Sequence, residues 1–226
     1  MFSDKRMKAL GKSVVLFCHI TSRVEGEPYP NLLHQMQGRG FPALRFLNAK
    51  GELLSIYNGA RKVESIEFAA EGLNELAQLE AALAAGDKKV APKILAHKLK
   101  LGMLSNADAE KQRAELKGLS AKLGRELDNL VRDQKILNLV KATSRKSKDS
   151  LAEAAKEFKA ITRASGTPKA NNVQRLIWPI MVDHAVAVSD KKLMKKALKA
   201  TKKAYGKSID KDWIRRMERT LKHMKR

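Results

Sequence analysis

Cysteine and histidine are the first residues to consider for nucleophilic, redox or metal chemistry, and the chain has few of them. It contains one cysteine, Cys18. A single thiol excludes an internal disulfide and a multi-cysteine zinc site. Cys18 also lies in the apolar run 14–20, where burial raises a thiol pKa and blocks access to it. We therefore interpret Cys18 as a structural residue.

The histidines do not form a catalytic or metal-binding pattern. His19 has no second ligand at metal-binding spacing. Asp183 and His184 are adjacent, which on a helix turns their side chains about 100° apart rather than into a dyad. The other three histidines stand alone on predicted helices: His34, His97 and His223. The sequence also lacks a phosphate-binding glycine loop and a nucleophile elbow. It thus predicts no catalytic residue, no metal site and no cofactor.

Lysine is the charged residue that recurs at a helical spacing. The recurring positions are Lys191, Lys192, Lys195, Lys196, Lys199, Lys202 and Lys203. Residues 186–226 carry 15 basic and four acidic side chains. Such a row forms either a solvated amphipathic face or a surface that binds nucleic acid or another polyanion non-specifically. No base-reading motif accompanies it.

The charge also divides the chain into two parts. Residues 1–85 hold ten basic and nine acidic residues, whereas the rest holds 36 and 15. Gly86 and Asp87 between these parts read as a helix stop followed by a new helix cap. We therefore predict two domains, 1–85 and 86–226.

The first part combines strand and helix patterns. The apolar run 14–20 predicts a buried strand, and residues 31–36 a short helix. Residues 43–47 and 52–57 alternate around a four-residue turn that contains Gly51, which predicts an antiparallel hairpin. Apolar residues recur at helical period over residues 63–85.

Beyond Gly86 the pattern is helical throughout. Seven helices are predicted, over residues 87–101, 106–123, 125–142, 148–164, 168–188, 191–205 and 210–224. Their short connections predict antiparallel helical hairpins. Pro179 should kink or restart its helix. The last three helices faintly resemble tetratricopeptide hairpins, although no clean repeat period is present.

The sequence Gly40-Phe41-Pro42, with the hairpin and helix after it, resembles the second half of the thioredoxin family. The resemblance implies a cis peptide bond at Pro42. It also implies that the Phe41 backbone pairs with an extended peptide or thiol substrate, which makes Gly40, Phe41 and Pro42 the substrate-binding residues. The alternative is a rigid loop before an edge strand.

The resemblance leaves out the redox half of that fold. Only 13 residues precede Val14, so the first strands and the Cys-x-x-Cys helix have no counterpart. We expect the natural protein, or its ancestor, to begin further upstream. The predicted fold class is α/β plus all-α: a partial thioredoxin-like sheet-and-helix domain followed by an antiparallel helical-hairpin domain.

Two functions follow from these patterns. The first is a thioredoxin-like protein, either redox-silent or a truncated thiol-disulfide oxidoreductase, whose helical module binds a protein or peptide. It would be an enzyme only if a Cys-x-x-Cys lies upstream. The second is a basic protein that binds nucleic acid or another polyanion. With neither a membrane span nor a signal peptide in the sequence, a cytoplasmic location is expected, or an extracytoplasmic one if a signal peptide lies upstream.

Overall fold

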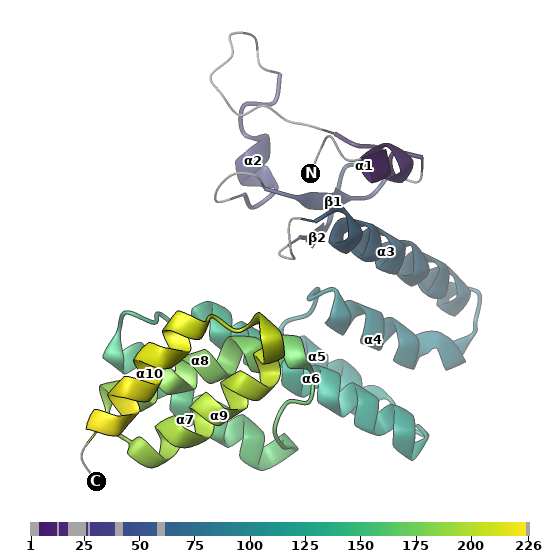
Figure 1. The fold of residues 1–226 in the computed structure, drawn as a ribbon. Helices are drawn as coiled ribbons and strands as arrows, with labels where there is room; N and C mark the ends of the chain where they lie inside the picture. Colours follow the sequence, from purple (N-terminus) through teal and green to yellow (C-terminus); the bar gives the residue numbers. More distant parts are fainter. Residues whose placement is uncertain are drawn as a thin grey trace. The chain divides into compact units, whose positions relative to one another are not determined.

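The computed structural model describes residues 5–12, 14–17, 26, 28–38, 43–57 and 62–224. These residues are mostly helical, and the chain divides into two compact units, Met1–Met103 and Leu104–Arg226. Figure 1 labels the elements of both units. The predicted boundary at Gly86 falls in the turn between two helices that pack together within the first unit.

The first unit combines a hairpin with helices. Its elements are α1 (Lys5–Leu10), α2 (Leu32–Gln35), β1 (Arg45–Leu47), β2 (Leu53–Ile56), α3 (Val63–Ala84), the 3-10 turn η1 (Lys88–Val90) and α4 (Ala91–Lys100). The strands pair antiparallel, with Arg45 opposite Ile56. In the turn, the Asn48 side chain accepts hydrogen bonds from the backbone N–H groups of Lys50 and Glu52, each at 2.9 Å. The predicted hairpin is therefore confirmed.

The predicted thioredoxin-like fold is wrong. Within the described residues the sheet has two strands, β1 and β2, and no further strand joins them. The described part of the predicted strand 14–20 is irregular, and the side chains of Val15 and Phe17 are 95% and 65% exposed. A central strand needs a neighbour for its backbone N–H and C=O groups. Among the described residues, no such strand lies beside residues 14–17.

In the first unit, the buried apolar residues that pack beside the hairpin come from helices. Met7 and Leu10 of α1, which the sequence did not predict, pack with Val63 and Ile66 of α3. Phe46 of β1 packs on the edge of this cluster, where its ring meets the Tyr57 ring edge-on at a centroid distance of 6.1 Å. The hairpin thus rests on helices and not inside a larger sheet.

The second unit consists of helices alone in its described part. They are α5 (Asn106–Glu115), α6 (Ala121–Ala142), α7 (Lys148–Ser165), α8 (Asn171–Ala187), α9 (Lys191–Tyr205), the 3-10 turn η2 (Gly206–Ser208) and α10 (Lys211–His223). Helix α8 is apolar around most of its circumference and packs against α6, α7 and α9 (Figure 1). Its Ile177 and Val182 are fully buried. The expected antiparallel helical hairpins are therefore present.

Three predicted helix features differ from the structure. The break expected at Gly124 lies earlier, because Gly118 turns the chain at φ +67° and Ser120 caps α6 by accepting from the Leu123 N–H. Helix α8 begins at Asn171 rather than at Pro168. It also continues through Pro179, so the restart, one of the two predicted effects of this proline, does not occur, and the other, a kink, stays a prediction.

Candidate polyanion-binding surface

The sequence-predicted sites of the first part of the chain fall outside the described residues. This applies to Cys18 and His19, and to the substrate-binding residues expected from the resemblance, Gly40, Phe41 and Pro42. The thiol-disulfide function and the peptide-binding role of these three residues stay predictions. No described residue bears on them.

The titratable residues of the described helices do not assemble a catalytic centre. Asp183 pairs with Arg145 at 2.5 Å, while the neighbouring His184 buries its Nδ1 atom without a hydrogen-bond partner in the described structure. In the first unit, His97 lies 3.5 Å from Glu75. The part of the chain that the structure describes contains no group of three or more side chains able to hold a metal ion.

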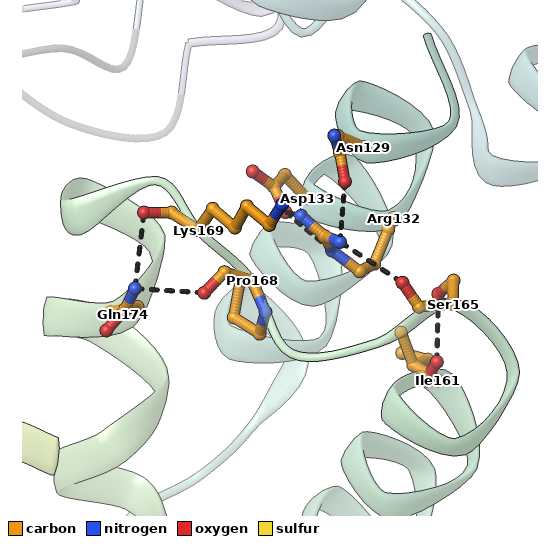
Figure 2. A network of polar contacts seen from close by, with 8 residues as sticks. All are labelled: Asn129, Arg132, Asp133, Ile161, Ser165, Pro168, Lys169 and Gln174. Carbon is orange, nitrogen blue, oxygen red and sulfur yellow. Dashed lines mark hydrogen bonds and ion pairs between the residues drawn. The ribbon is translucent and has the colours of Figure 1, made fainter. Parts of the chain in front are cut away.

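A buried polar network joins α6 to the end of α7 (Figure 2). The Arg132 guanidinium is 3% exposed and donates from Nε and Nη2 to Asp133 Oδ1, at 3.0 and 2.8 Å. Its Nη1 donates to Asn129 Oδ1 at 2.8 Å and to the Ser165 carbonyl at 3.1 Å. Most N–H donors of the Arg132 guanidinium are thus satisfied by hydrogen bonds within the fold. The network holds α6 and the end of α7 together, and we call it the clamp.

Asp133 titrates in an environment that opposes its charge. Burial raises the pKa of Asp133, because desolvation disfavours the carboxylate, and the hydrogen bond from Arg132 opposes this increase. The positive charge of Arg132 favours the ionised Asp133 carboxylate, which accepts both of its hydrogen bonds. We therefore assign Asp133 to the clamp and not to acid–base chemistry.

The lysines of α9, unlike Arg132, lie on the exposed side of their helix. Met194, Ala197, Leu198, Thr201 and Ala204 fill one side of the helix and are buried. At 3.6 residues per turn, all seven lysines fall in an arc of roughly 140° on the other side. The exposed ones are Lys192, Lys195, Lys196, Lys199, Lys202 and Lys203. Helix α9 contains no acidic residue that could neutralise them.

The caps of α9 explain why the prediction of this helix was accurate. Asp190 accepts a hydrogen bond from the Leu193 N–H at 2.8 Å and so caps the first turn. Gly206 ends the helix with φ +56°, a conformation that is costly for other residues. These caps hold the lysine row on a regular helix.

Helix α10 carries a second basic row, which the sequence analysis did not assign to a site. Ile214 is buried, and Trp213, Met217 and Leu221 pack against the same core. The exposed basic residues Lys211, Arg215, Arg216, Arg219 and Lys222 occupy the remaining arc, again of roughly 140°. Their spacing of three and four residues was a signal that could have revealed them.

Contacts between α9 and α10 fix the two rows relative to each other. Lys191 Nζ, at the start of α9, donates to the Met224 carbonyl beyond the end of α10 at 2.9 Å. Near the end of α9, Lys202 pairs with Glu218 at 2.5 Å. This opposite order makes the helices antiparallel neighbours, as Figure 1 shows for α9 (green) and α10 (yellow).

The antiparallel arrangement brings both rows to one face. Each basic arc begins at the seam marked by Lys202 and Glu218, and each apolar arc faces the common core. Because the helices run in opposite directions, their arcs extend outward on the same side of the seam. We call this continuous surface of α9 and α10 the basic face.

Pro179 contributes indirectly to the position of the basic face. Proline has no N–H, so the Arg175 carbonyl loses its usual partner in α8. The Tyr205 hydroxyl, at the end of α9, donates to this carbonyl at 3.1 Å. In return, Arg175 Nε donates to the Ala204 carbonyl at 2.8 Å, and its guanidinium lies 5.4 Å from the Tyr205 ring centroid. The interruption in α8 therefore anchors α9.

Within the described residues, no helix combines the length and apolarity needed to cross a membrane. The sequence matches no protein-family model, no curated protein and no solved structure.

Proposed function

We propose that this protein binds the phosphate backbone of nucleic acids, without reading sequence, through the basic face of α9 and α10. The observation that carries the proposal is the pair of cationic rows on one face of two packed helices. Of the acidic residues on these helices, Glu218 pairs with Lys202 and Asp212 with Arg215. The other lysines of the α9 row have no ion-pair partner among the described residues.

The charge density of α9 supports a nucleic-acid ligand. Seven lysines along a 15-residue helix give one positive charge per roughly 3 Å of helix axis, since each residue rises 1.5 Å. One strand of DNA carries a phosphate every 3.4 Å or so. The two spacings match without any base-specific contact.

The lysine side chains also suit a non-specific ligand. Lysine presents a compact point charge on a flexible stem, whereas specific readout of bases commonly uses the planar fork of arginine. Ammonium groups of this kind follow a phosphate backbone and add the same interaction at any sequence. We therefore expect similar affinity for different sequences of equal length.

Two charge variants of the full chain test the proposal by fluorescence anisotropy with a 20-base-pair DNA duplex. The α9 variant replaces Lys192, Lys195, Lys196 and Lys199 by glutamine. The control variant makes the same change at four exposed lysines of α6, α7 and their connection: Lys141, Lys146, Lys148 and Lys159. Both lose four charges.

We expect the α9 variant to bind about a hundredfold more weakly at 100 mM salt, because four phosphate contacts are lost. The control variant should lose less than about fivefold, since only the general field of the protein changes. Equal losses in the two variants would show that net charge, and not the basic face, determines binding. That result would contradict the proposal.

A further inference from the structure

Resting on the proposed function, we infer that the basic face binds double-stranded nucleic acid in preference to a single strand, with the α9 row on one strand and the α10 row on the other. Packed helices lie about 8–10 Å apart. This separation lies between the widths of the two DNA grooves, about 6 and 12 Å. Two rows carried on neighbouring helices are therefore separated by a distance of the same order as a groove width, so that each row can lie along one of the two backbones that border a groove.

The pair at the seam separates the rows. Glu218 accepts from Lys202 and places a carboxylate between the α9 and α10 cations. A phosphate backbone that ran along the seam would meet this negative charge. Backbones on either side of the seam would meet mainly cations, because Asp212 is the one carboxylate within the α10 row and it pairs with Arg215. This arrangement is expected for two strands and not for one.

The aromatic side chains of the second unit give an independent reason. Single-strand binding relies on aromatic rings on which bases stack. Phe158 and Trp178 are buried and contact each other edge-on, with ring centroids 5.3 Å apart. Trp213 packs against the core, and the Tyr205 ring is covered by Arg175. By helical period, Tyr205 and Trp213 also fall outside the basic arcs of α9 and α10, so the described part of the basic face presents no Phe, Tyr or Trp ring to a base.

The test measures the full chain against four probes of 20 nucleotides or base pairs: a DNA duplex, an RNA duplex, a DNA single strand and an RNA single strand. An α10 variant, with Arg215, Arg216, Arg219 and Lys222 replaced by glutamine, is compared with the α9 variant. Binding is measured by anisotropy at 50 and 100 mM salt.

We expect each duplex to bind at least tenfold more tightly than its single strand. Each variant should lose about a hundredfold in duplex affinity but only about threefold in single-strand affinity, because a single strand can move to the intact row. Comparison of the DNA duplex with the RNA duplex then shows which of the two the basic face binds more tightly.

Two results would overturn the inference in distinguishable ways. If a single strand binds as tightly as its duplex, the two-strand arrangement is wrong, while backbone binding stands. If no probe binds at 50 mM salt, the proposed function fails and the inference fails with it.

Discussion

Arg132 and the lysines of α9 carry the same charge in the same unit, but their environments make them different kinds of residue. The Arg132 guanidinium is buried, and its hydrogen bonds go to a carboxylate, an amide and a backbone carbonyl. The α9 lysines project from a regular helix on the side opposite the core. Cations with satisfied donors hold the fold together, whereas exposed cations remain able to bind an external anion.

The largest expected effect separates these two uses of charge. Arg132→Met removes one partner of a buried pair, and we expect it to lower the free energy of unfolding by about 3–5 kcal/mol, because Asp133 is left buried without its cation. Urea unfolding followed by circular dichroism measures this change.

Arg216→Met is the matched control on the exposed face of α10. It should change the free energy of unfolding by less than about 0.5 kcal/mol, yet weaken duplex binding several-fold. A folded, stable Arg132→Met protein, or a strongly destabilised Arg216→Met protein, would show that burial does not distinguish the two arginines.

The contact that anchors α9 should have a smaller effect. Tyr205→Phe removes the hydroxyl that bonds the Arg175 carbonyl, and we expect a loss of about 1 kcal/mol in the free energy of unfolding. In a Pro179→Ala background the new N–H of residue 179 can bond the same carbonyl. The Tyr205→Phe loss should then fall to half or less in a double-mutant cycle. An unchanged loss would mean that the proline does not create the need for Tyr205.

At the seam between the basic rows, a substitution should strengthen duplex binding rather than weaken it. Glu218→Gln removes a negative charge from the basic face and releases Lys202 from its ion pair. We expect duplex affinity to rise about two- to fivefold at 50 mM salt, and the gain to shrink at 200 mM as salt screens the charge. Weaker binding of Glu218→Gln at both salt concentrations would place the ligand elsewhere.

The smallest effects concern pH, and the two carboxylates should respond with opposite signs. Burial raises the pKa of Asp133, so the folded chain holds this proton more tightly, and the stability it contributes is lost as pH rises through the raised pKa. The hydrogen bond from Lys202 lowers the pKa of Glu218. The stability that Glu218 contributes is therefore present at pH values above the usual pKa of a glutamate, and it is lost as pH falls through the lowered pKa.

Urea midpoints between pH 3 and 7 check these signs in Asp133→Asn and Glu218→Gln. Relative to wild type, Asp133→Asn should gain stability as pH rises, while Glu218→Gln should lose it. Differences of the same sign in both variants would show that Asp133 and Glu218 do not have opposite pKa shifts.

The helices were predictable where local caps define them. Residues 191–205 were predicted as a helix with the bounds found for α9, because Asp190 and Gly206 mark its ends in the sequence. The hairpin was predictable for the same reason, through Asn48 and Gly51 in its turn. Both features depend on neighbouring residues alone.

The predictions failed where contacts between residues far apart in the sequence determine the structure. The run that begins at Val14 has strand composition, but the described residues provide no strand to pair with it. Pro179 was expected to kink or restart its helix; the restart does not occur, and nothing local indicates that Tyr205 supplies the missing donor. Arg132 and Asp133 look like ordinary surface charges in the sequence, because only the packing of α7 on α6 buries them.

The candidate site was predicted in part. The α9 row followed from lysine spacing, and its exposure agrees with the predicted amphipathic face. The α10 row was missed although its basic residues have the same spacing. That both rows share one face could not be predicted, because it depends on the antiparallel contacts at Lys191 and Lys202.

The most direct test of the central claim is the salt dependence of duplex DNA binding by the full chain. If six phosphates are contacted, the logarithm of the binding constant should fall with the logarithm of salt at a slope of about −5, which is on the order of a thousandfold between 50 and 200 mM. The α9 variant should flatten this slope by about three to four, and the control variant should leave it unchanged. A slope near zero, or an α9 variant with the wild-type slope, would contradict binding through the basic face.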